Sequence, residues 1–291
     1  MSVNAIEKKQ NEERMLRYQY AARRYNNSAE KLNDLVWICC IISVLIIFLP
    51  TNTTWGKFFI AVPFFMNIMA AILNWRMTIN VSIASALRKY FDAYVLGINI
   101  DQFTEPEVQK LEELSIKVSK HSPVKSEEQM SNTSRDYPPG VRNWYEFSQP
   151  LSEQDAIYEC QKQNCWWNKK MTLKRLIFTG IKLLVLIPFA IFFVIKANTN
   201  VEIMQVIFSS GGLITKCAER LGANGRYYML SLKIDGALDI LTNSRSVENI
   251  KKLQVEIDAR RAMPVLEINR IHKRHAKKIS ELYYDITTVQ K

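Results

Sequence analysis

One uninterrupted apolar stretch limits the folds open to this chain more than any other feature. Leu176–Ile195, LIFTGIKLLVLIPFAIFFVI, consists almost entirely of Leu, Ile, Val, Phe and Ala, and Lys182 is its one charged residue. As an α-helix rising about 1.5 Å per residue, the stretch reaches ~30 Å, the thickness of a bilayer's hydrocarbon core. It lacks the polar face of a soluble amphipathic helix. We therefore predict that it spans a membrane.

Three further apolar stretches predict more spans. Residues 35–50 contain no charge, and residues 57–75 return after a short turn. Residues 201–217 form the weakest stretch, because polar residues interrupt it. The sequence predicts an all-α membrane protein with four transmembrane helices in two hairpins, over residues 35–76 and 175–217.

The distribution of charge predicts the topology. Residues 1–34 carry 7 Lys and Arg against 5 acids, residues 76–175 carry 14 against 13, and residues 216–291 carry 15 against 9. The predicted outer turns, around residues 51–57 and 197–200, are almost free of charge. Cytoplasmic loops of membrane proteins carry the excess of Lys and Arg. We expect a multi-pass membrane protein with both termini in the cytoplasm.

The remaining segments are predicted to be cytoplasmic. Residues 1–34 form an N-terminal helix, residues 77–174 an insert with an aromatic-rich segment, and residues 218–291 a helical C-terminal region. The first of these has an apolar stripe, which either packs on another part of the protein or on the membrane, or belongs to a solvated helix that leads into the first span.

Local signals divide the insert. The second span is expected to continue as a helix to Leu96, where Gly97 ends it. Thr104 and Glu107 form a T-x-x-E capping box, so a helix is expected over residues 105–120. Residues 121–135 are polar and Ser-rich and predict a flexible loop.

Residues 136–170 are unusually rich in aromatic side chains for a cytoplasmic segment. Such a cluster forms a small packed core, lies at the membrane interface as a belt, or serves as a binding platform. Ser152 is the expected N-cap of a helix that begins at Glu153.

The C-terminal region is predicted to break at residues 243–244, to form a helix over 246–263, and to end in a helix over 266–286. His272 and His275 share a face of the last helix, where two solvated histidines are more common than a metal site. The five cysteines are expected to be reduced. We find no motif of an enzyme and expect no catalytic residue, metal or cofactor.

The fourth predicted span carries a polar stripe. Gln205, Ser209, Gly212 and Lys216 stand at i, i+4, i+7 and i+11, so they share one face of a helix. This face is either a candidate pore lining or a surface on which small residues allow close packing of helices.

Four sequence words carry a resemblance to a known family. They are FDAYVLGINID at Phe91–Asp101, DYPPGVRNWY at Asp136–Tyr145, ECQKQNCWWNKK at Glu159–Lys170 and LQVEIDARRAMPV at Leu253–Val265. In this order they resemble the bacterial SMODS-associating four-transmembrane effector family, and the likeness covers nearly the whole chain.

The resemblance implies a role in antiphage defence of the CBASS type. In such systems a nucleotide made during infection triggers disruption of the inner membrane by a pore-forming effector. The positions that match the family's motifs are Asp136, Tyr137, Trp144, Tyr145, Cys160, Asn164, Trp166, Trp167, Gln254, Ile257, Arg260, Arg261 and Pro264.

Two functions follow from these observations. The first is a regulated pore, formed by a homo-oligomer and controlled by a cyclic oligonucleotide or by a cytoplasmic sensor protein. Basic and aromatic residues suited to phosphates and bases are Arg135, Arg142, Trp144, Tyr145, Trp166, Trp167, Lys169, Lys170, Arg260 and Arg261. The alternative is a membrane-anchored scaffold that recruits a cytoplasmic partner without forming a pore. Neither function involves a nucleic acid polymer.

Overall fold

The computed structural model describes residues 3–49, 56–147, 151–243 and 245–264. All regular elements in these ranges are helices, and the one isolated β-bridge joins Thr133 to Arg142. The chain divides into two compact units. Among the described residues, unit 1 contains 3–28, 80–147, 151–169, 230–243 and 245–263, and unit 2 contains 29–49, 56–79, 170–229 and 264.

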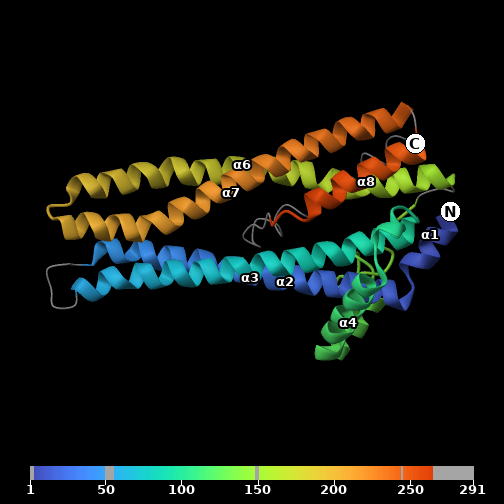
Figure 1. The fold of residues 1–291 in the computed structure, drawn as a ribbon, viewed down its shortest axis with the longest axis horizontal. Helices are drawn as coiled ribbons and strands as arrows, with labels where there is room; N and C mark the ends of the chain where they lie inside the picture. Colours follow the sequence, from blue (N-terminus) through green and yellow to red (C-terminus); the bar gives the residue numbers. More distant parts are fainter. Residues whose placement is uncertain (1–2, 50–55, 148–150, 244, 265–291) are drawn as a thin grey trace. The chain divides into compact units, whose positions relative to one another are not determined.

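Four long helices contribute residues to both units. They are α2 (Glu13–Leu45), α3 (Gly56–Leu96), α6 (Glu153–Lys196) and α7 (Asn200–Asn243), drawn in blue, cyan, yellow-green and orange in Figure 1. The predicted continuation of the second helix to Leu96 is confirmed. Gly97 ends it with φ of 68°, a conformation that a residue without Cβ adopts at little cost.

The N-terminal segment is two helices rather than the predicted single one. α1 covers Val3–Gln10, and α2 begins at Glu13. At the break, the Asn11 side chain donates to the Glu7 carbonyl and to Asn143 Oδ1, which offers the backbone a local alternative to a continuous helix. Met15 and Tyr18 of the predicted apolar stripe are fully buried in the core of unit 1, which confirms the packing interpretation for this part of the stripe.

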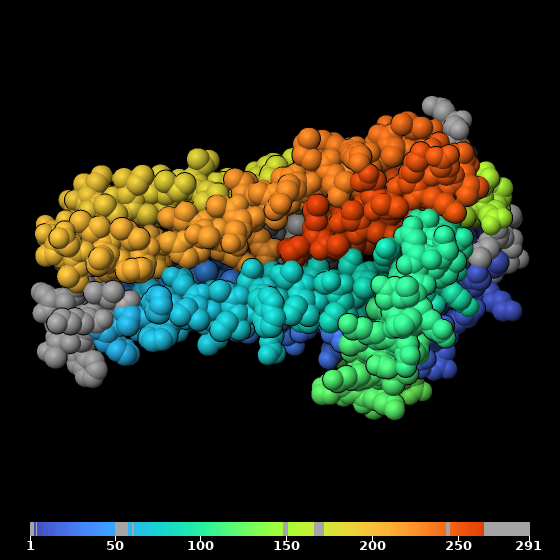
Figure 2. Space-filling model, viewed as in Figure 1, coloured from blue at the N-terminus to red at the C-terminus, as the bar shows by residue number. Residues whose placement is uncertain are grey.

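The helix after the capping box is confirmed. α4 covers Glu105–His121, and its capping box joins Thr104 to Glu107. Figure 2 shows α4 in green at the surface. The Glu107 carboxylate accepts hydrogen bonds from the Thr104 backbone N–H and hydroxyl, and these bonds lower its pKa.

The predicted loop over residues 121–135 was wrong in its first part. Pro123–Ser131 form helix α5, with Ser122 as N-cap and Pro123 in the first turn, where proline is well tolerated. Gln129 is buried, and its carbonyl accepts a hydrogen bond from Val141 N–H. Packing against residues 140–142 therefore stabilises a helix that its polar composition did not predict.

Aromatic residues of the insert belong to the core of unit 1. Tyr145 and Tyr158 are buried in it, and Trp144 and Phe147 pack against it. These four support the packed-core interpretation of the aromatic segment. Tyr137, in contrast, is 98% exposed.

Unit 1 is completed by the ends of α6 and α7 and by α8 (Val247–Arg261). Ser152 accepts a hydrogen bond from Asp155 N–H at the start of α6, as predicted for an N-cap. Ser246 likewise accepts from Asn249 N–H and caps α8 after the predicted break. The predicted helix over 266–286, with His272 and His275, lies outside the described residues.

Unit 2 presents large apolar side chains outward. They come from α2, the short 3-10 helix η1 (Ile46–Phe48), α3, α6 and the start of α7, and include Ile38, Ile41, Leu45, Phe64, Phe65, Ile72, Ile181, Leu184, Val185, Ile191, Phe192, Met204 and Ile207. Exposed apolar surface of this extent is costly in water and favourable in lipid. The chain is thus an all-α membrane protein.

Three described helices are long and apolar enough to span a membrane. They cover Glu13–Phe48, Ala61–Leu96 and Thr172–Lys196, so the predicted first three spans each lie in a suitable helix. The described part of α7 does not reach the same hydropathy. Its first half nevertheless turns Val201, Met204 and Ile207 outward.

Candidate functional site

A buried carboxylate lies at the centre of unit 1. Asp92 of α3 is 1% exposed, and three donors converge on its side chain. Tyr145 O–H donates to Oδ1 over 2.6 Å, while Gln254 Nε2 donates to Oδ2 over 3.2 Å. Arg261 Nη1 forms an ion pair with Oδ2 at 2.5 Å. A buried carboxylate is tolerated only with such partners, because leaving it unpaired in the interior costs several kcal/mol.

Tyr145 is held on several sides. Its hydroxyl accepts from Asn164 Nδ2 over 2.8 Å while it donates to Asp92. Gln10 of α1 brackets its backbone, accepting from Tyr145 N–H and donating to its carbonyl. Burial, together with the negative charge of Asp92, raises the pKa of Tyr145 well above its usual value. The phenol therefore stays protonated and remains a donor.

Further polar contacts join α6 to α8. Gln161 Nε2 donates to the Ile250 carbonyl over 3.0 Å and to Gln254 Oε1 over 3.2 Å. Arg260 is almost fully buried, and its Nη2 donates to the Asn164 carbonyl over 3.2 Å. The helices are thus fixed by directional contacts as well as by apolar packing.

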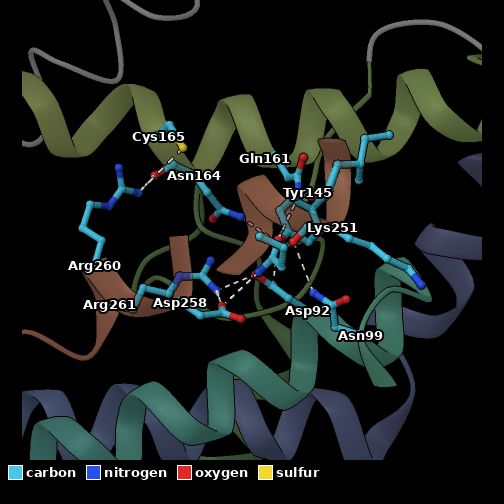
Figure 3. Close-up of polar contacts among 12 residues, drawn as sticks. Asp92, Asn99, Tyr145, Gln161, Asn164, Cys165, Lys251, Asp258, Arg260 and Arg261 are labelled. Carbon is cyan, nitrogen blue, oxygen red and sulfur yellow. Dashed lines mark hydrogen bonds and ion pairs between the residues drawn. The ribbon is translucent and has the colours of Figure 1, made fainter. Parts of the chain in front are cut away.

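This network gathers residues from all four of the sequence words singled out above (Figure 3). The first word supplies Asp92, and the second supplies Tyr145. The third and fourth supply the remaining members, which are Gln161, Asn164, Cys165, Gln254, Asp258, Arg260 and Arg261. Segments that are distant in sequence therefore form one buried cluster, which we call the Asp92 network.

Asp258 is the member whose charge is most sensitive to pH. It accepts from Gln254 Nε2 over 3.0 Å and lies 3.8 Å from Arg261 Nη1. Burial raises its pKa from 3.8 to about 7, Arg261 opposes the rise, and the charge of Asp92 adds to it. Asp258 thus changes its protonation near neutral pH.

Two buried cysteines lie in or beside the network. Burial raises the pKa of the Cys160 and Cys165 thiols, so neither is an activated nucleophile. All five cysteines lie in the described ranges, and none of them forms a disulfide bond. Within the described ranges, no group of three His, Cys, Asp or Glu side chains is placed to hold a metal ion.

The polar stripe of α7 lies within unit 2. Gln205 is buried, and its Nε2 donates to the carbonyls of Ile46 and Leu49 over 2.6 and 3.2 Å. These carbonyls lie in and just after η1, where helical partners run out. Gln205 thereby satisfies backbone groups that would be costly to leave unpaired in lipid.

The other stripe residues also face the first hairpin. Lys216 Nζ donates to Asn74 Oδ1 over 2.6 Å, and Asn67 Nδ2 donates to the Phe208 carbonyl over 3.1 Å. Ser209 is fully buried, with no hydrogen-bond partner for its hydroxyl among the described residues. A Cβ added to Gly212 would lie 2.0 Å from Asn67 Oδ1. This arrangement supports the packing interpretation, and the pore-lining role stays a prediction.

The chain matches one family model over nearly its whole length. The family model of the SMODS-associating 4TM effector domain matches residues 4–278. The chain belongs to this family. Neither a curated protein nor a solved structure matches it. Family membership and the apolar helices together indicate a membrane effector in a CBASS-type context.

The family-motif residues occupy several different environments. Tyr145, Cys160, Asn164, Gln254, Ile257, Arg260 and Arg261 lie in or beside the Asp92 network. Asp136 and Tyr137 are exposed instead. Asp136 accepts from the Thr133 N–H and hydroxyl, which lowers its pKa and fixes the turn before the Pro-Pro-Gly sequence. Pro264 accepts from Arg220 Nη1 in unit 2.

The structure separates the predicted signal-binding residues. Tyr145, Arg260 and Arg261 are engaged in the Asp92 network. Arg135 pairs with Glu146, Arg142 Nε donates to the Met130 carbonyl, and the Arg88 guanidinium lies 5.6 Å from the centre of the Trp144 ring. The side chains of Trp166, Trp167, Lys169 and Lys170 lie outside the described part of the structure.

A surface cavity of about 500 Å³ lies beside Arg135 in unit 1. Its lining includes the amides of Gln10, Asn11 and Asn143, together with Phe147. Glu146 also lines it, so the cavity presents both signs of charge.

Asp92 and Asp258 are functional candidates that the sequence did not reveal. Both lie in the quoted words, but neither has a spacing that identifies a known motif. The sequence feature that could have pointed to Asp92 is its place beside the apolar residues Leu87, Phe91 and Val95, which are fully buried in the core. Only the fold shows that two acids meet one arginine there.

We predict that Tyr145→Phe destabilises the protein by about 1–3 kcal/mol, because Asp92 and Asn164 both lose a buried hydrogen-bond partner. The apparent melting temperature in detergent should fall by several degrees. Tyr137→Phe is the matched control, since its side chain is exposed, and it should change stability by at most about 0.5 kcal/mol. Equal effects of the two substitutions would contradict the role given to the Tyr145 hydroxyl.

The raised pKa of Asp258 predicts a pH dependence of stability. Between its ordinary value of 3.8 and about 7, the folded state binds more protons at this site than the unfolded state. Proton binding by Asp258 stabilises the folded state fully below pH 3.8, and this stabilisation is lost as the pH rises through about 7. Plots of melting temperature against pH should therefore differ in slope between wild type and Asp258→Asn across this pH range. Parallel pH profiles would show that Asp258 titrates normally.

The close approach at Gly212 predicts a difference between two adjacent glycines. Alanine at either position gains about 0.5–1 kcal/mol of helix propensity, but only Gly212→Ala displaces the Asn67 side chain from its hydrogen bond with α7. An alanine Cβ at Gly211 meets nothing within 4 Å. We expect Gly212→Ala to melt at a lower temperature than Gly211→Ala in detergent, and the opposite order would contradict the packing.

Proposed function

We propose that this protein is a pore-forming effector of a nucleotide-signalled antiphage system, which disrupts the bacterial inner membrane when activated. The supporting observation is the buried polar face of α7 in a unit whose outward surface is apolar. A span that only anchors a protein needs neither Lys216 nor Ser209, whose hydroxyl has no hydrogen-bond partner among the described residues. Polar residues at membrane depth commonly mark a path for water or ions.

The described arrangement is then the closed state. In it the polar face of α7 packs on the first hairpin, but the Ser209 hydroxyl and Asn67 Oδ1 have no hydrogen-bond partner among the described residues. Water in an open conduit would satisfy both groups. A single four-helix bundle encloses little water, so the open state is a homo-oligomer in which each copy contributes α7.

The Asp92 network is the proposed control element. It joins α3, α6 and α8, and α3 and α6 continue into unit 2 without a break in the helix. A signal that favours a different arrangement of this network would shift the equilibrium between the conformations of the membrane helices. The signal acts either as a cyclic oligonucleotide that binds unit 1 or through a cytoplasmic sensor protein.

The cavity beside Arg135 is the proposed entry point for a nucleotide. Phe147 offers an aromatic surface for a base and Arg135 offers a cation for phosphate, while Glu7 and Glu146 add negative charge to the lining. Arg135 pairs with Glu146 in the described state, so an anionic ligand would have to replace that carboxylate. Binding of such a ligand would therefore break the Arg135–Glu146 ion pair and rearrange this part of the cavity.

The proposed effector crosses the membrane four times and catalyses no reaction. Four crossings would leave both termini in the cytoplasm, on the side where a nucleotide signal is made. The effector acts by opening a path rather than by a reaction, and it uses no cofactor or metal.

Dye release from liposomes tests the pore. Full-length protein should release a small dye when a cyclic oligonucleotide that calorimetry shows to bind is present. Gln205→Leu with Ser209→Leu should abolish release, because the wettable face is lost. Met204→Leu with Ile207→Leu, on the outward face of the same helix, should leave release unchanged.

Flotation of the liposomes establishes that each variant is inserted. Inserted wild-type protein that never releases dye would contradict pore formation and favour the membrane-anchored scaffold. Release that persists in the Gln205 and Ser209 variant would return the stripe to a packing role. Absence of binding to every cyclic oligonucleotide tested would leave the sensor-protein route.

A further inference from the structure

If the protein forms the pore proposed above, the charged residues on the buried face of α7 affect which ions that pore conducts. We infer that Lys216 makes the open state selective for small inorganic anions over cations.

Lys216 is only 5% exposed, and its ammonium donates to the neutral amide of Asn74. No ion pair with Lys216 exists among the described residues. An ionised lysine at membrane depth is costly, and a neutral amide does not cancel its charge. A role that needs the positive charge accounts for keeping it, whereas a packing role would be served by an uncharged side chain.

The same face of α7 has a second cation but no buried carboxylate among its described residues. Arg220 lies one turn beyond Lys216, where its guanidinium donates to Asn33 Oδ1 over 2.8 Å. Glu219 is exposed. Glu202 lies at the start of the helix, where its carboxylate accepts from Asn198 N–H over 2.7 Å. The remaining polar residues on the face are neutral.

An oligomer would repeat this excess of positive charge in every copy. Each copy would contribute one Lys216 at the same depth, and the copies together would form a ring of ammonium groups around the conduit. Rings of lysine or arginine select for anions, because the local positive potential concentrates them and repels cations. The effect is strongest where water is scarce, since a low dielectric screens charge weakly.

Reversal potentials in planar bilayers under a potassium chloride gradient test the inference. Full-length wild-type protein should show a chloride-to-potassium permeability ratio above unity. Lys216→Arg should keep that preference, Lys216→Gln should lower the ratio because only Arg220 of the two cations then remains on this face, and Lys216→Glu should lower it further. Lys182→Gln is the matched control, because it removes a cation from α6, where the Nζ lies 4.3 Å from the centre of the Trp37 ring. It should leave the ratio unchanged.

The reversal potential does not depend on how many pores are inserted, so a variant that folds poorly still reports its selectivity. A wild-type preference for potassium, or an unchanged ratio in Lys216→Gln, would overturn the role of Lys216 while leaving the pore intact. Absence of conductance from wild type and all variants would instead contradict the pore itself, and the inference with it.

Discussion

The structure of unit 2 depends on the need to satisfy backbone polar groups within the protein where lipid replaces water. Gln205 donates to the carbonyls at the end of the first apolar helix, and Asn67 donates to a carbonyl of α7. Outward positions are filled by apolar side chains. The polar residues of α7 lower its hydropathy for this reason, and they are also the residues that fix it to the first hairpin.

Unit 1 solves a related problem with a different result. Its interior contains a carboxylate, an arginine and a second acid, which three helices and one loop bring together. Buried ion pairs contribute little net stability, but they require a specific arrangement of the elements that hold them. A cluster of this kind on helices that continue into unit 2 is suited to control, since a change in its contacts alters the helices themselves.

Sequence patterns predicted the elements well where local physics decides them. The apolar stretches, the end of a helix at Gly97, the capping box at Thr104 and the N-cap at Ser152 all follow from composition or from one side chain near a helix end. Helix α5 was missed because its stability comes from packing. The Asp92 network was also missed, since no local pattern reports which distant segments will share a buried carboxylate.

The central claim is that α7 crosses the membrane with its polar face turned inward. Attaching accessibility tags at residue 291 and in the turn at residues 197–199 of the full-length protein in cells tests it most directly. The account predicts that the C-terminal tag is protected inside the cell while the tag in the turn is labelled from outside. Labelling of both tags from the outside would leave three crossings and would contradict the account.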